Sequence, residues 1–258
     1  MTSANIVGYQ QVSIPSGYYI FTPTFKNIGE NQQFDIKTLR PYLINGNAVS
    51  RNQTVKIFVL DNEGNYGVAI VWYGSTGIWT KDGATAIADG EVMVGTGNGI
   101  AVQNTVKVNS STGAEVAKGG VTTPIYFLVS GEVDLICQNV VPAGYMINGN
   151  STPAAINLRN VTPRLPNGNA VSRNQTVKIF LLDDEGNYGP AIVWYGATGI
   201  WTTDGSAEIS TAEGALAVGQ GFAVQNTVKV NASTGTEVAK GGASTPIYLE
   251  LPSPIVGE

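Results

Sequence analysis

The feature that most constrains this chain is an internal repeat. Residues 45–128 align without a gap with residues 167–250, at a constant offset of 122 positions (167 − 45 = 122). Roughly 60 of the paired positions are identical, and the stretch NGNAVSRNQTVKIF occurs unchanged in both copies. Because a repeat fixes the plan of a whole fold, we expect two similar units in tandem, each near the common size of a domain.

The segments that precede each copy match more loosely and place the boundary between the units. Residues 12–20 (VSIPSGYYI) match residues 139–147 (NVVPAGYMI), with an offset of 127 at the shared proline. The first unit therefore carries five extra residues within residues 22–44. We expect units at residues 1–131 and 132–258. The run YFLVSGEVDLICQN crosses this boundary with a single glycine, which favours rigid packing and leaves strand exchange or a shared sheet open.

Each unit has the pattern of an all-β fold. The run TVKIFVLDNEGNYGVAIVWYG predicts a strand, a turn and a returning strand, and GSTG predicts the next turn. The segment NTVKVNSSTGAEVAKGG predicts a third hairpin, TPIYFLVSGEVDLICQNVV a central strand pair, and residues 35–39 at most one helical turn. Strands about 8–12 residues apart predict duplicated β-sandwich or barrel-like units with antiparallel strands and little helix.

Composition excludes several classes of function. Only 13 % of the residues are charged, the net charge is −5, and the chain has no histidine. It therefore lacks the basic face of a nucleic-acid-binding protein, and no apolar run reaches the roughly 18 residues of a membrane span. Without histidine it also lacks the commonest general base and transition-metal ligand. We expect no nucleic-acid partner, no membrane insertion and no enzymatic activity. The single cysteine, Cys137, lies in an apolar run and is expected to be buried.

The balance of residues also predicts a location. Low charge with abundant Gly, Asn, Thr, Ser and Val is typical of secreted β-proteins. The opening MTSANIVGYQ lacks the apolar core of a signal peptide, which fits a cytosolic start or a mature secreted chain in which Met replaces the signal. We expect a secreted or cell-surface protein.

The opening ANIVGYQQVSIPSGYYI resembles a family of uncharacterised bacterial secreted β-proteins. Their mature chains begin with Ala-Asn-x-Val-Gly-Tyr, continue with Pro-x-Gly-Tyr, and later carry a GxGxxVQ segment. The matching residues here are Ala4, Asn5, Val7, Gly8, Tyr9, Pro15, Gly17, Tyr18, Gly97, Gly99, Val102 and Gln103, with the last four echoed by Gly219, Gly221, Val224 and Gln225. The second unit has DLICQN in place of the Gly-Tyr opening. The resemblance implies secretion and a β-fold, and it carries over no activity.

The four tryptophans form two pairs, in VWYGSTGIW and VWYGATGIW. The two indoles of a pair flank a four-residue turn, so we expect them opposite each other in a hairpin and on one face. Such a pair suits stacking on a pyranose ring, and burial in the core with the adjacent tyrosine towards solvent is the favoured alternative. The candidate ligand-binding residues are Trp72, Tyr73, Trp79, Trp194, Tyr195 and Trp201.

Two acidic turns are candidate calcium sites. DNEGN (residues 61–65) and DDEGN (residues 183–187) place hard oxygen ligands in a tight turn, as calcium requires. Their spacing does not fit an EF-hand loop, and a plain hairpin turn is the alternative. The second turn has one more carboxylate, so the candidate ligands are Asp183, Asp184, Glu185 and Asn187. No other cofactor is expected.

A pair of carboxylates could serve a glycoside hydrolase without histidine. The candidates are Asp82, Glu91 and Glu115, matched by Asp204, Glu213 and Glu237. Nothing in their spacing marks a catalytic pair. The leading hypothesis is therefore a non-enzymatic extracellular β-repeat protein for cell-surface structure, adhesion or self-assembly, whose partners are further copies of itself or surface glycans. A tandem carbohydrate-binding module, in which two weak sites gain by avidity, is the first alternative, and a glycoside hydrolase is the second.

Overall fold

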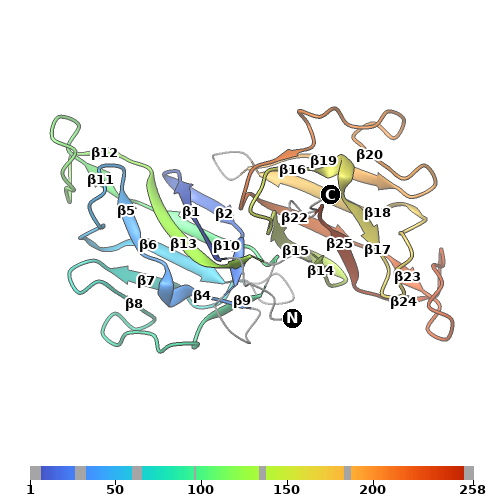
Figure 1. Cartoon of the computed structure of the whole chain (residues 1–258), viewed down its shortest axis with the longest axis horizontal. Coiled ribbons are helices and arrows are strands. Elements are labelled where there is room, and N and C mark those ends of the chain that lie inside the picture. The colour runs from blue at the N-terminus through green and yellow to red at the C-terminus, as the bar shows by residue number, and fades with distance from the viewer. Residues whose placement is uncertain are drawn as a thin grey trace.

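The computed structural model describes residues 7–26, 33–59, 66–95, 97–133, 138–182 and 187–252. Within these ranges all named strand pairs are antiparallel, and helix is limited to two short 3-10 turns. Figure 1 shows the N-terminal half of the chain (blue to green) beside the C-terminal half (yellow to red). The predicted all-β, antiparallel fold class with little helix is confirmed.

In the N-terminal half, two sheets face each other across one apolar core. The first sheet contains β1 (Val7–Ile14), β13 (Ile125–Val133), β3 (Phe25–Lys26) and β5 (Pro41–Leu43). The second has the order β2 (Gly17–Phe21), β10 (Ile100–Asn104), β6 (Asn52–Val59), β7 (Ile70–Tyr73) and β8 (Ile78–Thr80). Alternate residues of both sheets, such as Phe127 and Ile57, point into this core. The arrangement is a β-sandwich. The run from Thr123 to Val141 is predicted to form a central strand pair; β13 is central, but the strand that follows, β14 (Gln138–Val141), is an edge strand of a different sheet, so the two do not pair.

The C-terminal half repeats this arrangement around a second apolar cluster that extends from Val141 to Leu251. Its smaller sheet contains β14 (Gln138–Val141), β25 (Ile247–Glu250) and β17 (Thr162–Arg164). Its larger sheet has the order β15 (Gly144–Gly149), β22 (Gly221–Asn226), β18 (Asn174–Leu182), β19 (Tyr188–Tyr195) and β20 (Ile200–Thr202). The hairpins expected from the repeated sequence are therefore present in both halves.

Short elements complete each half. Four two-stranded pairs lie outside the main sheets: β4 (Gln33–Asp35) with β9 (Met93–Gly95), β11 (Lys107–Val108) with β12 (Val121–Thr122), β16 (Ile156–Asn157) with β21 (Ala215–Leu216), and β23 (Lys229–Val230) with β24 (Ala243–Ser244). The 3-10 turns are η1 (Ile36–Thr38) and η2 (Leu158–Asn160). The first of these is the single helical turn that the sequence predicts.

The two larger sheets meet end to end, and we call this contact the joint. Isolated bridges pair Phe21 with Gln220 and Asn98 with Asn148. These bridges are reciprocal, because Gln220 is the counterpart of Asn98 in the repeat and Asn148 is the counterpart of Phe21. The joint is therefore built as a two-fold symmetric interface would be, within one chain.

Glycines allow the backbones to approach at the joint. A Cβ built on Gly149 would lie 2.1 Å from Thr22 Oγ1 and 2.7 Å from the carbonyl oxygen of Gln220. Backbone hydrogen bonds cross the joint, since the N–H of Thr22 donates to the carbonyl of Gly219 at 2.8 Å and the N–H of Gly99 donates to the carbonyl of Ile147 at 3.3 Å. A side chain larger than hydrogen at position 149 would force the two sheets apart.

We predict that Gly149→Ala lowers the free energy of unfolding by about 1–3 kcal/mol, because the added methyl group overpacks the joint. Urea-induced unfolding followed by circular dichroism measures this change. The matched control is Gly189→Ala, where the new Cβ would lie 3.4 Å from the carbonyl oxygen of Leu181, an ordinary contact. Equal stability of the two variants would contradict the prediction.

Candidate functional site

The two tryptophan pairs lie in the cores. Trp72 stands opposite Trp79 across β7 and β8, with ring centroids 5.2 Å apart, and Trp194 stands opposite Trp201 at 5.3 Å. No more than 3 % of any of these side chains is exposed. Each indole N–H donates to a backbone carbonyl at 2.6–2.8 Å. The predicted cross-strand pairing is confirmed, and the tryptophans are buried in the core, which was the favoured alternative; as candidate ligand-binding residues they are therefore wrong, because buried ring faces cannot stack on a ligand.

The neighbouring tyrosines are held in loop contacts. Tyr73 is half-buried, its hydroxyl accepts from Gln53 Nε2 at 2.6 Å, and it packs against Gly83, where a Cβ would lie 2.5 Å from the hydroxyl oxygen. Tyr195 makes the same bond with Gln175 at 2.7 Å. The structure therefore does not bring the six candidate aromatic residues together at one surface.

The candidate calcium turns fall almost wholly outside the described residues. This applies to Asp183, Asp184 and Glu185, to the equivalent turn at residues 61–65, and to Cys137, whereas Asn187 is described and exposed. Among the described ranges, no group of three or more His, Cys, Asp and Glu side chains could hold a metal ion.

The candidate catalytic carboxylates of a glycosidase accept hydrogen bonds from nearby backbone N–H groups and so stabilise loops. Backbone N–H groups of Thr85 and Ala84, followed by the hydroxyl of Thr80, lower the pKa of the Asp82 carboxyl well below its ordinary range. In the second half the backbone N–H groups of Ser206 and Ala207 do the same to Asp204.

The glutamates are constrained in a similar way. The backbone N–H of Ala88, followed by Lys81, lowers the pKa of Glu91, and the backbone N–H of Ser210 lowers that of Glu213. A general acid needs a raised pKa, so these shifts have the wrong direction for that role.

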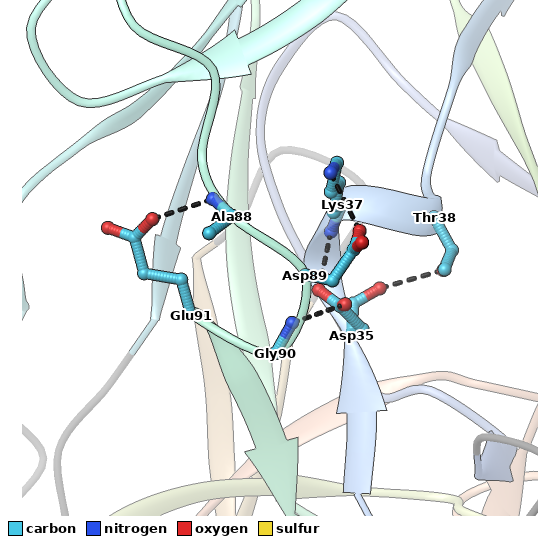
Figure 2. A network of polar contacts seen from close by, with 7 residues as sticks. All are labelled: Asp35, Lys37, Thr38, Ala88, Asp89, Gly90 and Glu91. Atoms are coloured by element: carbon cyan, nitrogen blue, oxygen red, sulfur yellow. Dashed lines mark hydrogen bonds and ion pairs between the residues drawn. The ribbon is translucent and has the colours of Figure 1, made fainter.

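Figure 2 shows carboxylates that join the segment around Asp35 to the segment that contains Gly90. Asp35, which is buried, accepts at Oδ1 from the backbone N–H of Lys37 and at Oδ2 from that of Gly90, both at 2.9 Å. Lys37 Nζ forms an exposed ion pair with Asp89 at 2.7 Å. These polar groups satisfy one another across two segments, so we interpret the cluster as structural.

A surface that the sequence analysis missed lies on the outer faces of the larger sheets. Along β2, β10 and β6 the register aligns Tyr18 with Gln103 and Lys56 on the face turned away from the core. The same row recurs in the second half as Tyr145, Gln225 and Lys178. We call the four exposed tyrosines of this region, Tyr18, Tyr66, Tyr145 and Tyr188, the tyrosine face.

The joint brings the two halves of the tyrosine face together. Tyr66 packs edge-on against Phe58 with centroids 5.9 Å apart, and Tyr188 against Phe180 at 6.2 Å. Partial burial of the Tyr188 hydroxyl, followed by the nearby Tyr66, raises the pKa of Tyr188. Tyr66 remains 61 % exposed and Tyr188 58 % exposed. Each ring is thus supported by a phenylalanine while it remains exposed to solvent, and the two hydroxyls are close enough to interact electrostatically.

A second unpredicted feature is the arch, which we define as residues 50–54 (SRNQT). Gln53 has a φ of 64° and its counterpart Gln175 a φ of 65°, and these are the non-glycine residues with positive φ in the described chain. This backbone conformation costs on the order of 1 kcal/mol and persists only where surrounding contacts impose it. Its presence in both halves marks the arch as a candidate site.

Contacts on both sides of the arch impose this conformation. The Glu115 carboxylate accepts from the backbone N–H and the hydroxyl of Ser50 at 2.7 Å each. Asn52 Oδ1 accepts from the backbone N–H of Ser75 at 3.0 Å. In the second half Glu237 holds Ser172 at 2.6 Å in the same way. Hydrogen bonds from two other segments therefore hold the arch in this conformation.

An open groove of about 580 Å³ lies beside the arch. Its lining includes Arg51 and Asn52 of the arch, Ser75 of the following turn, Lys107 of β11 and Val116. Among the described residues, neither Arg51 nor Lys107 forms an ion pair. The sequence signal for this site was the identical stretch NGNAVSRNQTVKIF, which contains the arch, but identity between copies carried no functional meaning by itself.

Comparison of the chain with protein-family models, curated proteins and solved structures found no match. No helix within the described ranges has the length and apolar character needed to cross a membrane. The functional assignment therefore rests on the tyrosine face and the arch.

The lowered pKa of Asp82 and Asp204 predicts a loss of stability in acid. Because both folded-state values lie below the ordinary value of 3.8, the unfolded chain binds more protons, and stability falls as the pH drops from about 5 towards the folded-state values. The double variant Asp82→Asn/Asp204→Asn should show a shallower dependence of the unfolding free energy on pH.

Urea unfolding at pH 6 and pH 3 measures this dependence. The same measurement on the single variants Asp82→Asn and Asp204→Asn shows how much of the change each loop contributes. A double variant that keeps the parental slope would show that these two loops do not control the acid response.

Proposed function

We propose that this chain is a non-enzymatic extracellular protein of the adhesion type that binds glycans on the tyrosine face. The observation that supports the proposal is the pair of exposed rings, Tyr66 and Tyr188, which pack on Phe58 and Phe180 and whose hydroxyls interact electrostatically across the two halves. An exposed tyrosine offers an apolar ring face for the C–H groups of a sugar and a hydroxyl for its polar groups.

The surroundings of the rings also suit a sugar. Gln103 donates from Nε2 to the Tyr18 hydroxyl at 2.8 Å, which fixes one ring and leaves the amide oxygen for a ligand hydroxyl. Lys56 and Lys178 lie in the same rows of the sheets. Such a mixture of rigid rings and amides recognises neutral polyhydroxylated ligands, in which many weak contacts add up.

The absence of histidine and the lowered pKa values of four candidate carboxylates support a binding role over hydrolysis. The rigid joint presents two sets of rings in one orientation, so a glycan chain that reaches both gains by avidity. Secretion or attachment to a cell surface, which the composition favours, would place this face in contact with glycans.

A glycan array followed by calorimetry tests the proposal. We expect binding to at least one glycan class and a loss of about tenfold or more in affinity for Tyr66→Ala/Tyr188→Ala, since stacking contributes about 1–3 kcal/mol per ring in other systems. Tyr66→Phe/Tyr188→Phe keeps both rings and should retain most of the affinity.

The matched control is Tyr9→Ala, because Tyr9 is 82 % exposed but lies on β1 of the other sheet. Equal loss in Tyr9→Ala, or no binding across the array, would refute the proposal. Light scattering on the same proteins, without glycan, distinguishes self-assembly from glycan binding. Self-assembly would appear as a molar mass that rises with protein concentration and that Tyr66→Ala/Tyr188→Ala lowers.

A further inference from the structure

The arch is a second candidate binding site, and it lies at the end of the larger sheet opposite to the joint, where Tyr66 and Tyr188 lie. Asn52 begins β6 at the arch, whereas Val59 ends β6 beside Ile100 and Phe21 at the joint. The arch therefore occupies the opposite end of the sheet. It needs an explanation of its own, because its strained backbone at Gln53 is not used by any contact of the tyrosine face.

The contacts that hold the arch leave its cations unneutralised. Glu115 is the carboxylate nearest to the arch backbone, but it accepts from the N–H and hydroxyl of Ser50 and, at 3.4 Å, from the backbone N–H of Arg51. The Arg51 guanidinium and the Lys107 ammonium have no ion-pair partner in the described part of the chain. Both line the same groove.

The remaining polar groups of the groove add hydrogen-bond donors. The side-chain oxygen of Asn52 accepts from the backbone N–H of Ser75. This bond orients the side chain so that its Nδ2 group can donate to a ligand. The Ser75 hydroxyl also lines the groove. Two cations and two neutral donors around one cavity form a site for an anion, and the planar guanidinium suits sulfate and carboxylate oxygens equally.

The size of the groove indicates more than a single small ion. A volume of about 580 Å³ lies in the range of sites for small organic ligands. Val116 and Ala117 supply an apolar part of the lining, and the rest is polar. We infer that the arch groove binds an acidic saccharide, with Arg51 and Lys107 holding its sulfate or carboxylate group and Asn52 and Ser75 its neighbouring hydroxyls.

The second half carries the equivalent side chains Arg173, Asn174 and Lys229, and Ala197 replaces Ser75. Its arch has the same positive φ at Gln175 and the same carboxylate clamp on Ser172. A test variant must therefore replace the cationic side chains of both grooves at once. Otherwise binding at the second arch could mask the loss of binding at the first.

Isothermal titration of the full chain with defined tetrasaccharides tests the inference. The probes are a chondroitin sulfate tetrasaccharide, tetragalacturonate, neutral maltotetraose and inorganic sulfate. We expect at least one acidic saccharide to bind at least tenfold more tightly than maltotetraose. Preference for the first probe identifies sulfate as the recognised group, and preference for the second identifies carboxylate.

The test variant is Arg51→Gln/Lys107→Gln/Arg173→Gln/Lys229→Gln, for which we expect at least a tenfold loss of affinity for the acidic probe. The matched control, Lys37→Gln/Arg159→Gln, removes one exposed, ion-paired cation from each half outside the groove lining and should change the affinity by less than twofold. Arg51→Lys/Arg173→Lys keeps the charge but loses the planar fork, so an intermediate loss is expected. Circular dichroism and thermal unfolding confirm that each variant is folded.

Three results would overturn the inference: binding of acidic saccharides no tighter than maltotetraose, retention of binding by the folded arch variant, or an equal loss in the Lys37→Gln/Arg159→Gln control. If inorganic sulfate alone competes as well as the tetrasaccharides, the saccharide body is not recognised and the inference also fails. Tyr66→Ala/Tyr188→Ala should leave this binding unchanged, so the outcome is separable from that for glycans on the tyrosine face.

Discussion

The indole N–H groups are the contacts on which the rest of this structure depends. An indole buried in a core must place its N–H against an acceptor, because an unpaired buried donor is costly. Trp79 donates to the carbonyl of Leu39, directly after η1, and Trp72 donates to the carbonyl of Val49, directly before the arch. One pair of side chains therefore fills the core and fixes two loops at its edge, and the second half repeats this with Val161 and Val171.

This anchoring explains why the arch can hold a strained residue. The turn after β7 lies directly on the arch, since a Cβ on Gly74 would come within 2.3 Å of the carbonyl carbon of Ser50. Trp72 bonds to Val49, Gly74 packs against Ser50, and Glu115 accepts hydrogen bonds from Ser50. These contacts restrict the backbone that leads into Gln53, which keeps its positive φ. The cost of the left-handed conformation at Gln53 is thus offset by contacts that the core imposes.

The sequence could predict the strands but not the sites. Trp72 and Trp79 were placed correctly opposite each other because a four-residue turn between alternating strands sets their register. Alternation shows that two residues share a face, but it does not show which face is wet, so the burial of the indoles needed the structure. Tyr66 and Tyr188 interact electrostatically although they lie 122 positions apart in the sequence, a proximity that the local pattern could not predict. The strain at Gln53 is a property of the backbone and has no signature in composition.

The identity between the two halves has a consequence for how the chain folds. The stretch that forms the arch and most of β6 is the same in β18, so local pairing energies cannot tell a native partner from its counterpart in the other half. Adjacent similar units are prone to exchange strands and become trapped as misassembled species. Selection of the correct partner then falls to the strands that differ, GYYIF in β2 and GYMING in β15, which are also the strands that close the joint. The strands at the joint, where the two halves differ in sequence, thus distinguish correct from exchanged pairing.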